Sequence, residues 1–392
     1  MPLPRAIWAL GLASLFMDAS SELIHSILPV FMTATLGLSV VTVGVIEGMA
    51  EATAAIVKVF SGALSDWIGR RKPLVVLGYG LAALTKPLFP LASGIGLIVT
   101  ARFVDRIGKG IRGAPRDALI TDITPPAQRG AAFGLRQSLD SVGAFVGPLL
   151  AMILVVVFAG DLRSVFWIAV IPAALCVACI ILFVREPEAG PSAARRRVPL
   201  APAELARLPA RFWFVVAFAS VLTLARFSEA FLVLRAQDIG LTLVWIPVVM
   251  VVMNVVYAAT AIPAGYAADR VSRRTLLLWG LAMLVAADLV LAHAGGAGEL
   301  FAGTALWGLH MGLTQGLLSA IVADTAPADL RGTAFGVFNL ATGLFLLIAS
   351  GLAGYVWSAF GPQATFLAGA VFTVVAAAGL VFAPTRPGRA RG

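Results

Sequence analysis

Long apolar stretches, each about twenty residues long, recur along the whole chain and are separated by short polar or Gly/Pro breaks. Only helices fit this pattern, because the stretches are too long and too uniformly apolar for the strands of a membrane barrel. The pattern predicts twelve membrane-spanning helices. They cover 7–30, 42–64, 74–92, 96–118, 131–158, 164–184, 212–235, 243–265, 275–294, 299–322, 332–357 and 363–383.

Composition supports a membrane location. Hydrophobic residues make up 60% of the 392 residues, charged residues 12%, and the mean hydropathy is +0.95. A soluble domain carries roughly 25% charged residues, and its core could not hide this much apolar surface. We therefore expect an all-α, multi-pass protein of a bacterial inner (cytoplasmic) membrane, with the lipid bilayer as its solvent.

The net charge of +9 does not indicate a nucleic-acid partner, because the basic residues gather in alternate loops. The intervening loops hold almost none, with Arg163 and Arg235 as exceptions. This asymmetry follows the positive-inside rule and predicts that both termini are cytoplasmic. The loop residues concerned are Arg70, Arg71, Lys72, Arg129, Arg185, Arg195, Arg196, Arg197, Arg270, Arg273, Arg274, Arg331, Arg386, Arg389 and Arg391.

Two features that could suggest other chemistry have simpler interpretations. The first apolar run follows Arg5 like a signal peptide, but Asp18 and Glu22 interrupt it, so we expect an uncleaved first helix. Cys176 and Cys179 share one face of the sixth span, and we interpret them as packing residues, since no further Cys completes a metal site. We expect no metal and no cofactor.

The chain carries an internal duplication. The segment GALSDWIGRR that begins at Gly62 returns as GYAADRVSRR at Gly265. Likewise, DITPPAQRGAAFG at Asp122 returns as DTAPADLRGTAFG at Asp324. Both copies of the basic loop face the same side, so the repeats are parallel. Parallel repeats of this kind are typical of secondary transporters and predict two bundles with a polar cavity between them near the midplane.

The duplication also divides the chain. We predict a six-helix bundle over 1–185, a cytoplasmic linker over 186–211 and a second six-helix bundle over 212–392. The linker is rich in Pro, Ala and Arg, and 203–208 within it could form a short surface helix.

The motifs resemble those of the major facilitator superfamily across essentially the whole chain. Gly62-x-x-x-Asp66-x-x-Gly69-Arg70-Arg71 resembles the family's loop between spans two and three, with a weaker copy at 265–274. Arg102, followed by two glycines, resembles the span-four motif. The resemblance implies the two-bundle transporter fold, transport of a small molecule by alternating access, and a monomer.

A fourth resemblance concerns the direction of transport. Gly134, Gly143, Gly147, Pro148 and Ala151 resemble the span-five motif of the drug/proton antiporter branch, with Ala in place of its final Gly. The alternative is ordinary packing of small residues between helices. The second half does not repeat the pattern, since Phe345, Ala349 and Ser350 stand at the matching sites. The resemblance therefore implies exchange rather than facilitated diffusion.

The loop motif implies a conformational latch. Asp66 can cap the positive end of span eleven and join the bundles in the outward-facing-closed state. Arg70 would then pair with an acid at the end of span four, Asp122 first and Asp117 second. Simple topology explains the basic residues but not the Gly and Asp positions. The latch residues are Gly62, Asp66, Gly69, Arg70 and Asp122, with Asp269, Arg273 and Asp324 around the second copy.

Ionisable residues interrupt several spans, mostly in the first half. An ionised side chain at mid-helix costs about 2.5–3.5 kcal/mol on insertion scales, so these groups must pair or line a wet cavity. On span four they follow a helical stripe. They are Asp18, Glu22 and His25; Glu47, Glu51 and Lys58; Lys86; Arg102, Asp105, Arg106, Lys109, Arg112 and Arg116; Arg136 and Asp140; Arg226 and Glu229.

Two interpretations compete for these charges: structural ion pairs, or transport. Arg112 and Arg116 fit a snorkelling, structural role, and Glu47, Glu51 and Lys58 fit either. We favour transport for Asp18, Glu22, Arg102, Asp105 and Arg106, because the family's cavity is lined by spans one, four, seven and ten. The proton-coupling candidates are Asp18, Glu22 and Asp105 as carriers and Arg102 as their tuning partner.

The mechanism expected is electrostatic competition. Poor hydration disfavours the charged form of a carboxylate and a nearby arginine favours it, so opening or closing the cavity would move a proton. The second bundle would mostly shape the substrate pocket. Candidate substrate contacts are His25, Arg106, Lys109, Arg226, Glu229, Asn254, Trp307, His310, Gln315 and Asn339.

Arg106 and Lys109 favour an anionic or zwitterionic substrate, although the nearby acids could neutralise their field. The leading hypothesis is a proton-coupled exporter of a small organic solute. Uptake or exchange of an organic or phosphate-like anion is the alternative. Metal transport through Met250, Met253, His310 and Met311 is a weaker one, because Met is a common gap-filler. A membrane enzyme or sensor has no supporting motif.

Overall fold

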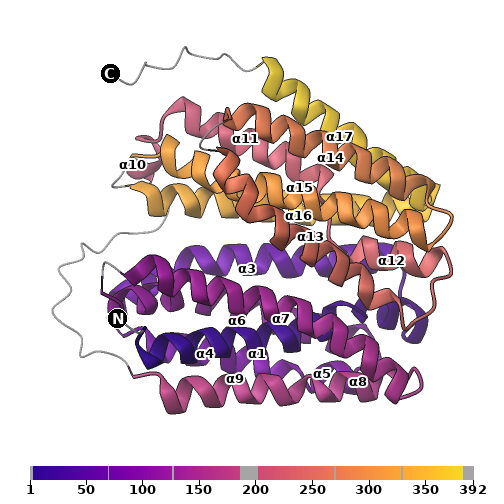
Figure 1. Ribbon diagram of the computed structural model, residues 1–392, viewed down its shortest axis with the longest axis horizontal. Helices are drawn as coiled ribbons and strands as arrows, with labels where there is room; N and C mark the ends of the chain where they lie inside the picture. Colours follow the sequence, from indigo (N-terminus) through magenta and orange to yellow (C-terminus); the bar gives the residue numbers. More distant parts are fainter. Residues whose placement is uncertain are drawn as a thin grey trace.

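The structure is a computed structural model that describes residues 3–68, 70–125, 128–185, 202–268, 271–327 and 330–382, with the backbone alone at 63, 66 and 382. These residues form helices and short connections, drawn in Figure 1 as two layers of helices. One layer contains the first half of the chain and the other the second half.

The first layer begins with a span broken into three helical pieces. Pro29 stands in the first turn of the second piece, and Pro87 precedes α5 in the same way, because proline cannot donate the backbone hydrogen bond that continues a helix. The helices are α1 (Arg5–His25), α2 (Leu28–Val30), the π-helix η1 (Phe31–Thr35), α3 (Val40–Ile68), α4 (Lys72–Thr85), α5 (Leu88–Leu91), α6 (Ile95–Ile123), α7 (Arg129–Val157), α8 (Leu162–Ile168) and α9 (Val170–Phe183).

The second layer also has a broken span, in which the non-helical residues 226–229 separate two helices. Its helices are α10 (Pro202–Leu205), α11 (Ala210–Ala225), α12 (Ala230–Asp238), α13 (Ile246–Ala268), α14 (Arg273–His293), α15 (Ala297–Thr325), α16 (Arg331–Phe360) and α17 (Pro362–Phe382).

The predicted fold class is confirmed. Within the described ranges, eleven helical segments are long and apolar enough to cross a membrane. The twelfth crossing is α6, whose charged stripe lowers its hydropathy below that of the others. The predicted spans agree with the observed helices to within a few residues. Residues 186–201 of the predicted linker lie outside the described residues, the short helix expected at 203–208 is α10, and the domain boundaries stay a prediction.

The two bundles meet along α3 against α16 and α7 against α13. Contact between α3 and α16 is very close at glycines. A Cβ placed on Gly44 would lie 2.3 Å from the carbonyl oxygen of Ser350, and one on Gly48 would lie 2.8 Å from the Cα of Leu347. Glycine is therefore required where these two helices cross.

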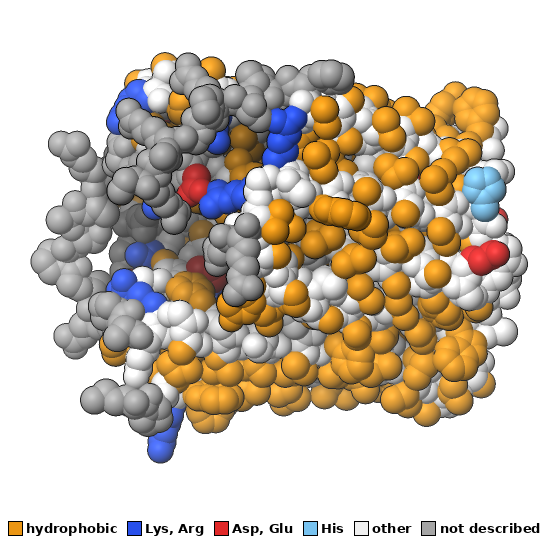
Figure 2. All heavy atoms as spheres, turned by 45° about the horizontal axis from the view of Figure 1, so that its top comes forward, with side chains coloured by type: hydrophobic (Ala, Val, Ile, Leu, Met, Phe, Trp, Pro, Cys, Tyr) orange, Lys and Arg blue, Asp and Glu red, His pale blue; other side chains and the backbone are white. Residues whose placement is uncertain are grey.

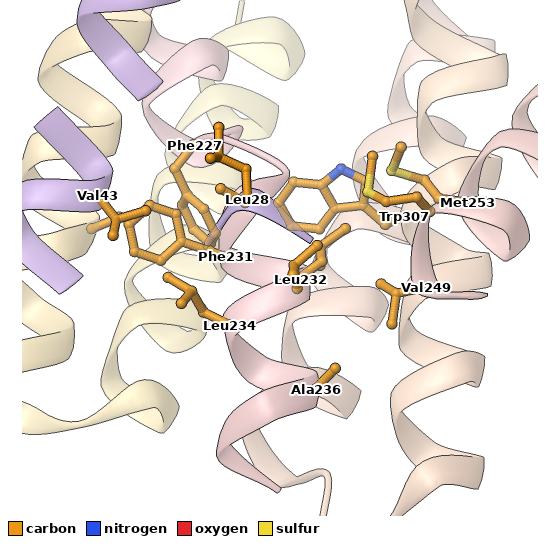
Figure 3. Packing of buried hydrophobic residues seen from close by; sticks show 14 of the residues in the cluster. Leu28, Val43, Phe227, Phe231, Leu232, Leu234, Ala236, Val249, Met253 and Trp307 are labelled. Carbon is orange, nitrogen blue, oxygen red and sulfur yellow. The ribbon is translucent and has the colours of Figure 1, made fainter. Parts of the chain in front are cut away.

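The ends of the molecule differ in how the bundles join. We call the end with the turns before α4, α7, α14 and α16 the basic-loop end. A single apolar cluster joins the bundles at the opposite end, where it includes Leu28 and Val43 from one and Phe227 and Phe231 from the other (Figure 3). Within the second bundle this cluster continues to Leu276 in the first turn of α14. At the basic-loop end each bundle has its own separate cluster. The bundles are therefore joined at the opposite end and apart at the basic-loop end.

The outer surface has the distribution that a bilayer requires. Figure 2 shows apolar side chains over the middle of one face and charged ones toward its ends. Exposed large hydrophobic residues occur on most of the long helices, for example Trp167 on α8, Trp279 on α14 and Tyr355 on α16. Lipid contact accounts for this exposure.

Candidate functional site

A cavity of about 260 Å³ lies between the bundles. Helices α1, α3 and α6 of the first bundle line it, together with the break at 226–229, α13 and α15 of the second. Phe227, Met250 and Trp307 form its apolar wall. Its ionisable lining residues are Glu22, His25, Glu47, Glu51, Arg102, Arg106, Lys109, Arg226 and Glu229.

Arg102 ties three helices together at the wall of the cavity. Its guanidinium on α6 donates to Glu47 on α3 and contacts the ring nitrogen Nε2 of His25 on α1. Arg102 is 2% exposed, so the Glu47 carboxylate balances a nearly fully buried charge.

Arg106 is held in a second pair. Its Nη1 lies 3.2 Å from Oε1 of Glu51, and its Nη2 lies 3.1 Å from Nε2 of His25. Arg106 was expected to make the cavity basic for an anionic substrate. The structure corrects this picture, because Glu51 on the facing helix neutralises Arg106.

Asp105 faces away from the cavity. Lys86 Nζ lies 3.0 Å from Asp105 Oδ1 and 3.0 Å from Ser21 Oγ, and the Lys86 side chain is 1% exposed. Asp105, expected to carry protons in the cavity, is therefore sealed in an ion pair between α4 and α6 and does not line the cavity.

Four charged residues line the cavity without such a pair in the described part of the chain. Glu22 has only His25 within ion-pair range, with Nδ1 of His25 3.7 Å from its Oε1. The Glu22 carboxylate is close enough to Glu229, on the other bundle, to be repelled by it. Lys109 is exposed to the cavity, and the buried Nε of Arg226 has no hydrogen-bond partner.

Asp18 lies one turn before Glu22 and belongs to a different part of the first bundle. It interacts electrostatically with Asp140 on α7 and with Arg112 and Arg116 on α6. Asp140 in turn forms an ion pair with Arg136, at 2.5 Å. Asp18 is thus in a polar cluster on the basic-loop side of the cavity rather than in the cavity lining.

The span-five glycines bring α7 against the helix that carries these acids. A Cβ on Gly143 would lie 2.5 Å from the carbonyl oxygen of Leu15 and 3.0 Å from the Cβ of Asp18. One on Gly147 would lie 2.7 Å from the oxygen of Ala19 and 2.8 Å from the Cβ of Glu22. Gly134 has open space instead, and Pro148 lies inside α7. Gly143 and Gly147 therefore allow α7 to pack closely against α1 beside Asp18 and Glu22.

The other predicted substrate contacts divide into two groups. Trp307 lines the cavity, but His310 faces α14, with its Nδ1 2.8 Å from the carbonyl oxygen of Gly280. Asn254 Nδ2 contacts the oxygen of Ala144 at 3.4 Å, across the bundle interface. Gln315 and Asn339 also lie outside the cavity lining.

The sequence reasoning missed Phe227, Ser228 and Met250 as lining residues, because nothing in the sequence marks the helix break at 226–229. Glu47 and Glu51, whose role it left open, line the cavity and hold its arginines. In the described residues, no group of three or more His, Cys, Asp and Glu side chains could hold a metal ion.

The loop motif is only partly described. Arg71, rather than Arg70, pairs with Asp122, with Nε 2.6 Å from Oδ2. Arg71 takes this place because it is the N-cap residue of α4 and its Nη1 also donates to Ser65 Oγ at 2.9 Å. The Arg70 side chain is exposed instead. Asp117 pairs with its neighbour Arg116 at 3.2 Å.

In the second copy of this motif, Arg273 pairs with Asp324. A Cβ placed on Gly62, near the end of α3, would lie 3.4 Å from the Cβ of Ala114. The side chain of Asp66 and residues Gly69 and Asp269 lie outside the described part, so the latch stays a prediction.

Two parallel bundles around a charged, partly accessible cavity define a secondary transporter. The chain matches the model of the Major Facilitator Superfamily over residues 10–255 and 230–392, and it belongs to this family. An uncharacterised MFS-type transporter of Methanocaldococcus jannaschii is 31% identical over 387 residues, which cover 97% of this chain and 95% of the relative.

Two further proteins are similar over nearly the whole chain. The inner membrane transport protein YajR of Escherichia coli K12 is 25% identical over 384 residues, 95% of this chain and 81% of that protein. A bacterial homolog of the human lysosomal transporter Spinster, solved in an inward-facing and occupied conformation, shares the fold with a TM-score of 0.78 at 17% identity and covers 96% and 95% of the two chains. These proteins are transporters rather than enzymes.

Proposed function

We propose that this transporter is a proton-coupled antiporter that exports a small anionic or zwitterionic organic solute by alternating access. The basic-loop end faces the cytoplasm in this proposal, so the structure is the conformation open to the cytoplasm. The apolar cluster of both bundles at the opposite end is then the closed outer gate.

One observation carries the proposal: Glu22 and Glu229, one from each bundle, line the cavity close enough to repel one another, and neither forms an ion pair with Lys or Arg among the described residues. Arg226 near Glu229 and Lys109 near Glu22 offset part of this repulsion, which is strong where water is scarce. A proton, or the amino group of a solute, removes this repulsion. Protons and solute therefore compete for the same two carboxylates, which is the requirement for exchange.

The solute's negative group has its own candidates. Arg226 and Lys109 line the cavity without an ion pair among the described residues, and Lys109 is exposed to the cavity. Both differ from Arg102 and Arg106, whose charges Glu47 and Glu51 balance, although the buried Nε of all three arginines lacks a hydrogen-bond partner. A carboxylate bound by Arg226 and Lys109, with an amino group at Glu22 and Glu229, gives a zwitterion four complementary contacts.

Proton coupling extends into the first bundle. Asp18 is one turn from Glu22, and Gly143 and Gly147 allow α7 to pack closely beside both acids. Movement of α7 during gating would change the surroundings of both carboxylates together. The glycines thus support exchange, as the antiporter motif implies. Asp105 would take part only if gating broke its pair with Lys86.

The test uses the full chain in proteoliposomes with an imposed pH gradient. Thermal stabilisation across a panel of amino acids, organic acids and amines first selects the solute. Its efflux should follow proton influx in the wild type. Glu22→Gln and Glu229→Gln should each keep solute counterflow but lose the response to the gradient, since the glutamine amide cannot exchange a proton.

The matched control is Glu299→Gln, because Glu299 lies in the first turn of α15 outside the cavity and accepts from the backbone of Gly295. It should transport like the wild type. Gradient-driven flux that survives both cavity substitutions would reject these carboxylates as the coupling site.

A second function, uptake or exchange of an organic or phosphate-like anion, is favoured by the unpartnered Nε of Arg226. It predicts stabilisation by inorganic phosphate or dicarboxylates and little by amines. Arg226→Gln would then abolish binding altogether, and Glu229→Gln would strengthen it.

A further inference from the structure

A carboxyl group in the second bundle has no partner at all in the described structure. Asp288 on α14 is 0% exposed, and neither Oδ1 nor Oδ2 has a hydrogen-bond partner. No ion pair includes it among the described residues. Buried polar groups are nearly always satisfied, so two orphaned oxygens on one side chain require an explanation.

The packing around Asp288 is tight and apolar. A Cβ placed on Gly369 of α17 would lie 2.9 Å from Oδ2 of Asp288 and 3.2 Å from Cε1 of Phe227. Only a glycine therefore leaves room for this carboxyl group, and the ring edge of Phe227 comes to the same point. Helix α14 packs mainly against α15 and α17, so the carboxyl group is enclosed inside the bundle.

Charged and titratable groups on the surrounding elements do not neutralise Asp288. Helix α17 carries no ionisable side chain over 362–382. On α15, His310 is bound to Gly280, a full two turns of α14 away from Asp288. On α13 such groups are Tyr257 and Tyr266, and Arg226 and Glu229 flank Phe227 in the helix break. None of them forms a hydrogen bond or ion pair with Asp288.

An isolated ionised carboxylate is excluded from such a place by its desolvation cost, and the group is neutralised instead. Asp288 therefore carries a proton in this conformation. Phe227 separates it from the cavity: the residue lines the cavity, and its ring packs on Trp307 at 5.5 Å and on Phe366 at 5.6 Å between centroids (Figure 3).

On α15, Thr304 lies close to Asp288 in register. Helices α14 and α15 run antiparallel, with Gly280 against Thr314 and Ala287 against Gly303, which brings Thr304 to the level of Asp288. The Thr304 hydroxyl oxygen is also buried without a partner. A small rotation of either helix would let the two groups bond, which gives the carboxylate a partner once the proton leaves.

We propose that Asp288 is a second proton-binding site of the transporter, placed in the second bundle and shielded from the cavity by Phe227. Only the role of this site in transport rests on the proton coupling proposed above; the binding of a proton by Asp288 does not. Residues 226–229 are non-helical, so rearrangement of this break moves Phe227 and opens Asp288 to cavity water. The carboxylic acid then releases its proton to water and becomes a carboxylate.

Infrared spectroscopy of the full chain in lipid tests this directly. The carbonyl band of a protonated carboxylic acid should be present at neutral pH and lost in Asp288→Asn. Asp161→Asn is the control, because Asp161 is an exposed helix cap whose pKa the Ser164 hydroxyl holds below its ordinary value. That control should keep the band. If the wild-type band is missing or survives in Asp288→Asn, the proposal is overturned.

Two further measurements test the shielding of Asp288 by Phe227 and the release of its proton. In heavy water the band should shift slowly in the wild type and much faster in Phe227→Ala. Phe231→Ala, which removes a ring from the same aromatic cluster, should stay slow. The band should also disappear reversibly at alkaline pH. A band that persists at every pH would show a permanently neutral structural acid and would reject the site.

A chemical assay can be made on the wild-type protein alone, so it does not depend on the folding of a variant. A hydrophobic carbodiimide should modify Asp288 in the wild type, since it reacts with protonated carboxyl groups in apolar surroundings, and peptide mapping locates the adduct. An unmodified Asp288 would overturn the proposal. Failure of proton-driven export in the Glu22 experiments would leave both the band and the adduct unchanged, so the two proposals fail separately.

Discussion

Two buried sites, one in each bundle, handle charge in opposite ways. In the first bundle, Arg102 and Arg106 on α6 and Lys86 at the end of α4 each face a carboxylate from a neighbouring helix. In the second, Asp288 stands alone among apolar side chains, although Arg235 in the same bundle is buried and paired with Asp238. The contrast is therefore between pairing at Arg102 and an unpartnered carboxyl group at Asp288. Substitutions at these two sites should act with opposite sign.

The largest effect is expected for Arg102→Leu. It would leave Glu47 as a buried charge without its partner, which costs about 3–5 kcal/mol of unfolding free energy. Denaturant unfolding in detergent should show this loss. Arg102→Leu combined with Glu47→Leu should recover most of it, because no unpaired charge remains. A double variant as unstable as the single one would mean that packing, not pairing, makes this site important.

Asp288→Leu should have the opposite sign. Leucine is similar in size and removes two buried oxygens that lack partners, so the same unfolding assay should show a gain of about 1–3 kcal/mol. Asp288→Asn should not gain, because its amide also lacks partners. A loss of stability in Asp288→Leu would show that the carboxyl group has a strong partner and would erase the contrast between the bundles.

Gly147→Ala tests a feature that the first bundle has and the second lacks, since Ala349 stands at the matching position. The added methyl group would overlap Ala19 and Glu22 on α1 and should cost about 1–3 kcal/mol. Gly134→Ala is the control on the same helix. It meets open space and should be neutral or stabilising by about 0.5–1 kcal/mol. Equal effects of the two would remove the argument for close packing of α1 and α7.

The smallest effect is expected where the copies agree. Arg71 pairs with Asp122 and Arg273 pairs with Asp324, and both pairs are partly exposed at the basic-loop end. Arg71→Ala and Arg273→Ala should each change the unfolding free energy by about 0–1 kcal/mol. A larger loss in either would indicate that the pair is part of a wider network, as a latch requires.

Much of the architecture could be predicted from the sequence, because spans, repeats and basic loops are local patterns. Even α6 was predicted from the recurring apolar stretches, as the span at 96–118, although its charged stripe lowers its hydropathy below that of the other spans. Which acid faces which base could not be predicted, since the pairs of Arg102 with Glu47, Arg106 with Glu51 and Lys86 with Asp105 depend on how helices distant in the sequence pack together. Asp288 was missed because a single acid in an apolar run gives no motif. Its position in the middle of the span at 275–294 was the available signal.

The alternating-access claim is tested most directly by spin-label distances at both ends of the molecule. One pair, Leu64→Cys with Val271→Cys, joins the bundles at the basic-loop end, and the other, Thr35→Cys with Thr242→Cys, joins them at the opposite end. Cys176 and Cys179 are replaced by Ala. Acidification should neutralise Glu22 and Glu229 and let the bundles approach, so the first distance shortens while the second lengthens. Glu22→Gln should weaken this response. Distances that stay fixed, or change together, would contradict a cavity that opens at one end as it closes at the other.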